Sequence, residues 1–577
     1  MPVSSRALFA LGACASVFQG AESFVGPAGF TVDLTSRQRQ DRVSSTCGGF
    51  LNIGGVSNKG KRCCATPPPV SAAAAGPAVA DVLAMDDAVV NPETVEDTAT
   101  AGAMQLSPAT KKAVRTTIKF GGSSLATPKR LMEVANLVKG LIEGGEMPIM
   151  VCSAMGKTTN NLLNAGDFAL KDGKVYVDAI QTLHLSACDE LSLGEHTKNE
   201  IKSLLTDLRS MLEGVGMLRE LTPRSKDRLV SYGERMSVRM MAATLNKVGV
   251  PAQHFDAWTL GMRTNDDFGN ADVLEESYPL IRQTLSKFDP NMVAVVTGFL
   301  GQSPDKQITT LGRGGSDLTA TVIGVACGVD EVQVWKDVDG MMTADPRSVP
   351  GAVPVPCVSY EEAAELAYFG ANILHPVSMR PAMKVGLPVR IKNSYNPSHP
   401  GTVIASRRDC GETLVTAITF KKGVELVDIV STRMLGQYGF LCKVFQLFAE
   451  DSLSIDMVAT SEVSISLTLD QEHHRESLLR CLDKVGDIAE VTENKNRSII
   501  SLIANVSRSS EVMAEVFAVM RDAGVQVLML SQGASKVNVG LVVKETDLEK
   551  AVQSLHYHFF EADNGVNPRV CHAGGEY

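Results

Sequence analysis

The chain has 577 residues, of which 44% are hydrophobic and 21% are charged, and its formal net charge is −10 at pH 7. This composition is typical of a globular protein with several domains, and the acidic balance without a dense Lys/Arg cluster argues against nucleic acid or an anionic membrane as the main partner. The twelve cysteines are scattered and none forms a C-x-x-C pair, which favours free thiols in a reducing compartment.

The first 114 residues have the composition of a leader and a linker. Residues 7–18 form an apolar run that is too short to span a membrane and contains a small-x-small cleavage pattern at Ala13-Cys14-Ala15. Residues 1–62 contain seven Lys/Arg and three acids, and residues 63–114 are rich in Pro, Ala and acids, which predicts a disordered linker. The leader resembles the bipartite signal of plastids acquired by secondary endosymbiosis and so predicts the plastid stroma. The alternatives are a secretory signal, the cytoplasm or the mitochondrion.

The fold is expected to begin near Arg115 with a strand, a glycine loop and a helix. The β-rich residues 116–120 end at Gly121-Gly122, and Thr127 before Pro128 is a helix start whose apolar periodicity ends at Gly144. Lys119 lies at the end of this strand, where a cation can bridge phosphates cradled by the glycine amides. A solvated strand-end lysine is the alternative.

The pattern of strand, polar loop and helix then recurs. Further strands are predicted at 148–152, 292–297 and 331–335, and a polar turn is predicted at 153–160. Strands that alternate with helices and carry polar loops at their carboxyl ends indicate an α/β sheet covered on both faces.

A second glycine-rich stretch, Thr309–Asp317, is the most informative segment of the chain. Its three glycines, at 312, 314 and 315, let the backbone approach an anion, and Arg313 supplies a planar charged fork for a carboxylate or phosphate. Asp317 begins an apolar helix over 317–327, so the preceding amides lie at a positive helix N-terminus. Two such loops predict a nucleoside triphosphate and an acidic second substrate.

An internal duplication follows the Pro/Gly-rich junction at 396–401. Apolar residues 441, 444, 445 and 448 form one helical stripe, and residues 513, 516, 517 and 520 repeat it 72 positions later. Each stripe precedes two predicted strands, at 454–458 and 463–469 and then at 526–530 and 537–543. Two copies are too few for a solenoid, so the duplication predicts a paired regulatory module.

Residues 115–560 resemble an aspartate kinase, most closely the single-function, lysine-sensitive form of plant plastids. The resemblance implies a three-layer αβα amino-acid-kinase domain over 115–405, two ferredoxin-like ACT domains (βαββαβ) over 414–490 and 497–565, and a tail over 566–577. The motifs that carry it are Lys119–Ser124, Ser153–Leu163, Leu229–Ser237, Val296–Leu300, Thr309–Thr321, Val334–Arg347, Ala367–Pro376 and Val389–Pro400, with Met434–Gly439 and Thr460–Leu469 in the regulatory half.

The implied activity is phosphoryl transfer from ATP to the side-chain carboxylate of aspartate, the first step of lysine, threonine and methionine biosynthesis. Such catalysis is mainly positioning and charge neutralisation. The resemblance implies that Lys119 and Asp317 are the catalytic residues. Asp317 would hold this lysine, cap its own helix, or do both. No His/Cys/carboxylate cluster has metal-ligand spacing, so Mg²⁺ is expected to arrive on ATP, bound by phosphate oxygens and water, with no metal site on the protein. The nucleotide contacts that the resemblance implies are Lys119, Gly121, Gly122, Ser123, Ser153, Lys336, Asp337, Met342 and Arg347.

Two positions depart from the pattern of the relatives. Asn372 replaces a lysine common in bacterial lysine-sensitive relatives, and Met342 replaces an aromatic residue, so neither a cationic phosphate contact nor base stacking is carried over there.

For aspartate, the resemblance implies contacts from Thr159, Glu234, Thr310, Arg313 and Ser316. An amino acid with a second carboxylate needs an anion for its ammonium and a guanidinium for its α-carboxylate, which Glu234 and Arg313 supply. An ordinary surface glutamate on a helix is the alternative for Glu234.

The duplication and the resemblance together predict inhibition by L-lysine at the first ACT module. At the 72-residue offset, Asp456 corresponds to Leu528 and Ser461-Glu462 to Gly533-Ala534, so only the first copy offers carboxylates for ammonium groups. Solvated turn acids are the alternative. The resemblance also implies a homodimer or dimer of dimers through the ACT domains. The full expected effector set is Met434, Gln437, Leu441, Ser454, Ile455, Asp456, Ser461 and Glu462.

Other functions remain open at this stage. A sister amino-acid kinase would share Lys119–Gly122 but would usually lack the paired modules, and a non-catalytic sensor would not need the set Lys119, Glu234, Arg313 and Asp317. A bifunctional kinase–homoserine dehydrogenase is not expected, since no G-x-G-x-x-G motif follows the second module.

Overall fold

The computed structural model describes residues 114–370, 374–406, 413–431, 438–470, 475–532 and 537–562. The leader, the linker, the tail after residue 562 and the predictions for Met434, Gln437 and Asn372 lie outside these described residues. The first sheet and its helices cover residues 114–405, and a second sheet begins at Val415.

An eight-stranded sheet organises the N-terminal part in the order β3-β4-β2-β1-β7-β9-β10-β8. All neighbours run parallel except β9 and β10. The strands are β1 (Val114–Phe120), β2 (Glu146–Cys152), β3 (Ala252–Phe255), β4 (Val293–Thr297), β7 (Glu331–Lys336), β8 (Cys357–Ser359), β9 (Val389–Asn393) and β10 (Thr402–Ala405), and a separate ribbon pairs β5 (Leu300–Gln302) with β6 (Ile308–Thr310).

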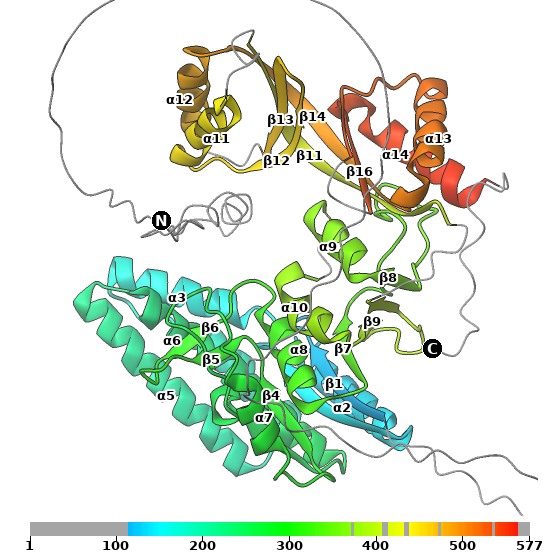
Figure 1. Ribbon diagram of the computed structural model, residues 1–577. Coiled ribbons are helices and arrows are strands. Elements are labelled where there is room, and N and C mark those ends of the chain that lie inside the picture. Colours follow the sequence, from blue (N-terminus) through cyan, green and yellow to red (C-terminus); the bar gives the residue numbers. More distant parts are fainter. Residues whose placement is uncertain are drawn as a thin grey trace, which may run out of the picture. The chain divides into compact units, whose positions relative to one another are not determined.

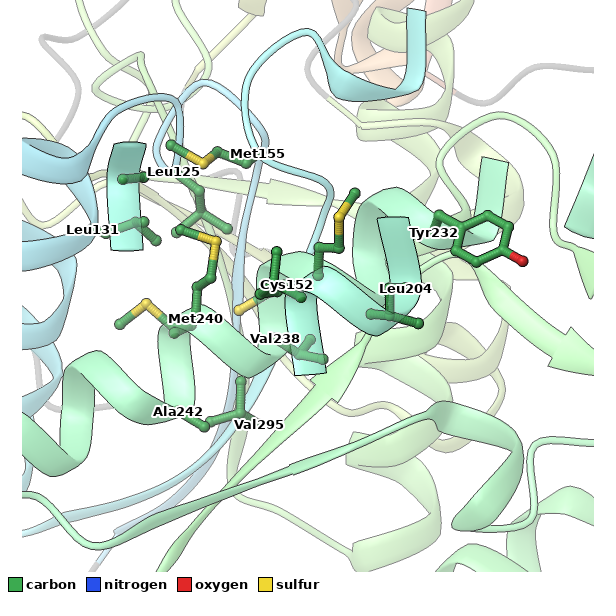
Figure 2. Close-up of a cluster of buried hydrophobic side chains, with 14 of the residues drawn as sticks. Leu125, Leu131, Cys152, Met155, Leu204, Tyr232, Val238, Met240, Ala242 and Val295 are labelled. Carbon is green, nitrogen blue, oxygen red and sulfur yellow. The ribbon is translucent and has the colours of Figure 1, made fainter. Parts of the chain in front are cut away.

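Helices cover both faces of this sheet, as the side chains of its central strands show. In β2, Met150 and Cys152 belong to one hydrophobic core and Val151 to the other, because successive side chains of a strand point to opposite faces. In Figure 2, Val238, Met240 and Ala242 of α6 lie against Cys152 of β2 and Val295 of β4. The first core packs against α2 (Pro128–Glu143), α3 (Thr158–Asp172), α4 (Asp178–Glu190), α5 (Glu195–Leu218) and α6 (Pro223–Lys247), and the second against α7 (Ser277–Leu285), α8 (Gly315–Cys327), α9 (Tyr360–Tyr368) and α10 (Pro376–Val385). The three-layer αβα prediction is confirmed.

The predicted start and end of α2 are confirmed. The side chain of Thr127 accepts a hydrogen bond from the amide of Arg130, Pro128 occupies the first turn, and the helix ends before Gly144. The polar turn after β2 is shorter than predicted, because α3 already begins at Thr158. Thr159 therefore lies in the first turn of a helix.

The C-terminal part is one six-stranded sheet shared by two modules, in the order β12-β13-β11-β14-β16-β15. Figure 1 shows α11 beside α12 on the first module and α13 near α14 on the second. The strands are β11 (Val415–Val430), β12 (Ile455–Thr460), β13 (Ser464–Asp470), β14 (Glu490–Ala504), β15 (Met529–Ser531) and β16 (Asn538–Lys544), and the helices are α11 (Phe440–Glu450), α12 (Arg475–Gly486), α13 (Ser509–Asp522) and α14 (Leu548–His556). Short 3₁₀ or π turns cover Ala257–Thr259, Val506–Arg508, Glu545–Asp547 and Tyr557–Glu561.

The two modules interlock through the long strands β11 and β14. Val415 and Ile418 of β11 lie in the core of the second module, whereas Val427 and Ile429 of the same strand lie in the core of the first. The register of β11 against β14 shifts between Lys421 and Val424, where one module gives way to the other. The second module is therefore assembled from residues on both sides of the first.

Candidate functional site

The carboxyl ends of four parallel strands meet at one edge of the first sheet. Phe120 of β1 is level with Cys152 of β2 and Trp335 of β7, and Cys152 is level with Thr297 of β4. A cavity of about 340 Å³ opens at this edge. It is lined by Lys119, Gly122, Ser153, Ala154, Gly156, Thr159, Glu234, Phe299, Gly312, Gly314, Gly315, Ser316 and Asp317.

Lys119 and Asp317 form a buried ion pair at the floor of the cavity. The Nζ of Lys119 lies 2.5 Å from Oδ1 of Asp317, and the Nζ of Lys336, at the end of β7, lies 3.5 Å from Oδ2. Burial favours the neutral acid, but the two ammonium groups outweigh it and keep the pKa of Asp317 below its ordinary value. Burial, together with the nearby charge of Lys119, lowers the pKa of Lys336. Two cations thus share one carboxylate, which leaves net positive charge for an anion.

Two loops that are far apart in the sequence line the cavity in direct contact. A Cβ on Gly122 would lie 2.9 Å from the carbonyl oxygen of Ala154, so only glycine fits this approach, and the amide of Gly156 donates to the carbonyl of Gly122 (3.1 Å). The hydroxyl of Ser153 donates to that of Ser316 (3.0 Å), which joins the β2 loop to α8.

Two glycines of the loop before α8 adopt a backbone conformation that favours glycine. Gly312 and Gly314 have φ of +70° and +71°, in the left-handed region that favours glycine. A Cβ on Gly314 would lie 2.7 Å from the Cβ of His375. Phe299, which follows β4, also has positive φ (+71°), and its ring packs against Gly315. Phe299 lies inside the motif Val296–Leu300, which predicted no role for it.

Glu234 is the carboxylate of the cavity that no cation pairs among the described residues. It lies on α6 and is 3% exposed, its Oε1 accepts a hydrogen bond from the amide of Ala154 (3.3 Å), and its Oε2 has no hydrogen-bond partner. Burial raises the pKa of Glu234 to about 8. A buried acceptor that faces a cavity without a partner is suited to a ligand cation.

Asp227, which no sequence motif singled out, links three segments around this site. Its carboxylate accepts hydrogen bonds from the amide (2.8 Å) and hydroxyl (2.9 Å) of Thr310 and from the amide of Gly269 (2.9 Å). Asp227 precedes Glu234 by seven residues on α6, so both lie on one helix face, a spacing that could have revealed it. The hydroxyl of Thr310 is therefore bonded to Asp227, and Thr310 does not line the cavity.

A polar network supports the first glycine loop. The hydroxyl of Ser394 contacts the hydroxyl of Ser124 (2.9 Å) and donates to the carbonyl of Lys336 (2.9 Å). Arg130 donates to Ser394 and lies 3.7 Å from the ring centre of Tyr395. These contacts connect the ends of β1, β7 and β9 on the side of the cavity where Lys336 lies.

Several residues expected in the site lie outside the cavity in this structure. Arg313 is exposed on the loop between Gly312 and Gly314, and Asp337 is exposed after β7. The backbone of Met342 forms a bridge to Pro354, and exposed Arg347 is paired with Asp345 through two nitrogen atoms. Gly121 and Ser123 belong to the first glycine loop without lining the cavity.

The described residues of the expected effector set lie on the first ACT module. Ser454, Ile455 and Asp456 lie at the beginning of β12, whereas Ser461 and exposed Glu462 lie at the turn after its end. Leu441 is exposed on α11. Among the described residues, no group of three or more His, Cys, Asp or Glu side chains is placed to bind a metal ion, and no helix combines the length and apolarity that crossing a membrane requires.

Comparisons with known families match the two halves separately. Residues 114–393 match the amino acid kinase family, and residues 427–482 and 500–559 match the ACT domain. The chain is 50% identical over 473 residues to aspartokinase 2, chloroplastic, of Arabidopsis thaliana, a match that covers 79% of this chain and 86% of that protein. It is 32% identical to lysine-sensitive aspartokinase 3 of Escherichia coli, covering 77% of this chain and 98% of that protein.

Solved structures agree with these matches. The crystal structure of E. coli aspartokinase III in complex with lysine and aspartate (T-state) aligns with a TM-score of 0.65 at 30% identity, covering 77% of this chain and 99% of that one. The complex of the same enzyme with aspartate and ADP (R-state) aligns with a TM-score of 0.63 at 30% identity, covering 77% and 100%.

Proposed function

The chain belongs to the aspartokinase family and is an ATP-dependent aspartate kinase, and we propose that its two substrates meet in the cavity between the glycine loops. An oxygen of the aspartate side-chain carboxylate attacks the γ-phosphorus of ATP, the bond from that phosphorus to the β,γ-bridging oxygen breaks, and 4-phosphoaspartate and ADP result. The attacking carboxylate is already ionised at neutral pH, so the step needs no general base.

Lys119 neutralises the charge that develops on the transferring phosphoryl group. Lys119 lies at the end of β1, where its ammonium pairs with Asp317 of α8 beside the amides of the first glycine loop. Lys336 adds a second cation on the same side. Mg²⁺ would enter with ATP and neutralise phosphate charge, held by phosphate oxygens and water, because the carboxylate of Asp317 is already shared by two lysines.

The buried carboxylate of Glu234 carries the assignment of the aspartate subsite. The structure of the E. coli enzyme contains bound aspartate. In this chain, the ammonium group of aspartate would pair with Glu234, whose Oε2 has no hydrogen-bond partner among the described residues. Arg313, exposed on the second glycine loop, would turn inward to bind the α-carboxylate as a two-nitrogen fork. Thr159 and Ser316 line the same cavity and would bind the remaining carboxylate oxygens.

Replacing Glu234 by Gln tests this subsite. Losing one desolvated charge pair should raise the KM for aspartate on the order of a hundredfold, with the KM for ATP nearly unchanged. The assay is ATP-dependent aspartyl hydroxamate formation. Glu462→Gln, a change of the same type on the regulatory half, should leave both KM values as in the parent. An unchanged KM for aspartate in Glu234→Gln would remove Glu234 from the site.

We also propose that L-lysine inhibits the enzyme through the first ACT module of a homodimer. Only the first module has a carboxylate at this position, because Leu528 corresponds to Asp456 in the second. The E. coli relative is named a lysine-sensitive aspartokinase. Asp456 and Glu462 lie at opposite ends of β12, roughly 20 Å apart at the rise of an extended strand, which exceeds the length of one lysine. An effector that uses both carboxylates therefore needs a second copy of the chain, and β12 is an edge strand of its sheet among the described residues.

We propose the plastid stroma as the location. The support is the similarity to chloroplastic relatives and the composition of the leader.

A further inference from the structure

We propose that Lys421 is a built-in occupant of the effector site: its ammonium binds the carboxylate of Asp456 in the absence of effector, and free lysine must displace it. The proposal rests on the proposed regulation by lysine and names what that lysine competes with. The chemical class of the ligand follows from the occupant, because a primary ammonium replaces a primary ammonium.

The geometry of the cluster supports this exchange. The Nζ of Lys421 lies 2.5 Å from Oδ2 of Asp456 and 3.0 Å from a carboxylate oxygen of Asp470. The side chain of Asp456 is 2% exposed, so the surroundings screen this pair far less than water would. An effector ammonium can reach this carboxylate only by replacing a partner that is already in place.

The charges of the cluster permit the exchange without an unpaired ion. Two carboxylates, Asp456 and Asp470, share the single ammonium of Lys421. When a second ammonium arrives at Asp456, Lys421 can keep Asp470 as its partner, so neither ammonium is left without a carboxylate. At the 72-residue offset, Lys421 and Asp456 correspond to Glu493 and Leu528, so the repeated positions carry neither group.

The same carboxylate also contacts the catalytic domain. The hydroxyl of Tyr368, the last residue of α9, donates to Oδ1 of Asp456 (3.1 Å). The next residue, Phe369, is buried between the two modules, and its carbonyl accepts a hydrogen bond from Thr419 (2.8 Å). Further along the chain, His375 packs against Gly314 of the second glycine loop. A change of partner at Asp456 therefore acts on the end of α9, and His375, seven residues further along the chain, lies beside the second glycine loop.

Lys421→Met tests the proposal in the full-length enzyme, with lysine binding measured by calorimetry and inhibition by the hydroxamate assay. Without the internal competitor, lysine should bind on the order of tenfold tighter and inhibit at correspondingly lower concentration, the effect of one hydrogen-bonded charge. Lys421→Arg should keep the wild-type affinity within a few-fold. The matched control is Lys422→Met. Lys422 follows Lys421, is exposed and pairs weakly with exposed Glu549 (3.4 Å), so this substitution should leave the lysine affinity unchanged.

Tyr368→Phe separates binding from transmission. It should bind lysine at least as tightly as the parent but be inhibited less completely at saturating lysine. Wild-type affinity in a folded Lys421→Met variant, judged by its circular dichroism and its activity without lysine, would overturn the proposal while leaving lysine regulation intact. If the parent enzyme neither binds lysine nor is inhibited by it, both the occupant role and the proposed regulation are refuted, whereas the kinase activity stands.

Discussion

At the scale of single residues, the cavity contrasts two buried carboxylates. Asp317 lies between two lysines, which keep its pKa below the ordinary value despite burial, so it remains an anion that positions cations. Glu234 has no cation, and burial raises its pKa to about 8. Near neutral pH, a positive ligand beside Glu234 therefore favours the ionised form of its carboxyl group. This difference supports the proposed assignment of Asp317 to a phosphate side of the cavity and of Glu234 to an ammonium side.

The pKa of Glu234 predicts how aspartate use depends on pH. Below about pH 8 the free enzyme carries a protonated Glu234, which cannot pair with the substrate ammonium, so kcat/KM for aspartate should rise about tenfold per pH unit and level off above pH 8. The KM for ATP should not follow this profile. In Glu234→Gln the rise should disappear, since no titrating group remains. A profile that is flat between pH 6 and 8 in the parent would contradict the assignment.

At the scale of elements, the start of α8 positions the second glycine loop. Gly314, the N-cap of α8, has positive φ and lies against His375, whereas Gly328, the C-cap of the same helix, has φ of +59° with open space around its Cα. Both positions carry the strain that a side chain meets in the left-handed region, but only Gly314 adds a clash. The pair therefore separates backbone strain from loop placement.

Gly314→Ala should lower kcat/KM for aspartate at least tenfold, because a shift of about 1 Å in a positioning loop has large kinetic effects. Gly328→Ala should cost about 1 kcal/mol of stability with near-parental kinetics. Thermal unfolding and the hydroxamate assay on both variants provide the test. Equal kinetic losses in the two variants would show that strain, and not the contact with His375, controls the loop.

Asp227 connects α6 to the strand that leads into the same loop. Asp227→Asn keeps one acceptor oxygen and replaces the other by an NH₂ donor. In one orientation the NH₂ group faces the amides of Thr310 and Gly269, and in the other it faces the hydroxyl of Thr310. We expect a destabilisation of about 1–3 kcal/mol and a KM for aspartate raised more than the KM for ATP. Asp227→Glu should restore part of the aspartate KM, which unfolding alone would not explain. Equal changes in both KM values would reduce Asp227 to a purely structural role.

At the scale of the whole molecule, the segment after β7 belongs to the regulatory half as much as to the catalytic one. Ala344 and Val349 lie in the core of the second module, and the hydroxyl of Thr343 is hydrogen-bonded to His556 of α14 (2.9 Å). Arg347 lies within this segment, which is why it is paired with Asp345 and not directed into the cavity. The proposed phosphate contact of Arg347 therefore requires this segment to move.

The leader predicts a two-step route into the plastid. A fusion of residues 1–114 to a fluorescent protein should reach the stroma of an alga with a secondary plastid, since the apolar run at 7–18 would direct entry and the basic segment would direct import. Deleting residues 1–15 should leave the fusion in the cytosol. Import without the apolar run would support a simple transit peptide instead.

Local patterns in the sequence determined much of the molecule. Glycines at 121, 122, 312 and 314 and the cap at Thr127 act through neighbouring residues, so they predict the two loops and the start of α2. The 72-residue repeat predicts a paired regulatory module, and the family resemblance identifies its halves as ACT domains. Lys119, Glu234 and Asp317 were named for the same reason: each lies inside a recognisable motif.

Only the tertiary structure decided what lies between the motifs. The link from Asp227 to Thr310 joins residues 83 positions apart, and the pairing of Lys421 with Asp456 joins residues 35 positions apart. The pairing of β11 with β14, which lets two modules share β11, joins residues 60 to 89 positions apart. Such contacts depend on how helices and strands pack, and hydrophobic periodicity specifies which face an element buries but not which polar side chains meet across it. The fold therefore determines that Glu234 has no cationic partner among the described residues and that Asp456 is paired with Lys421.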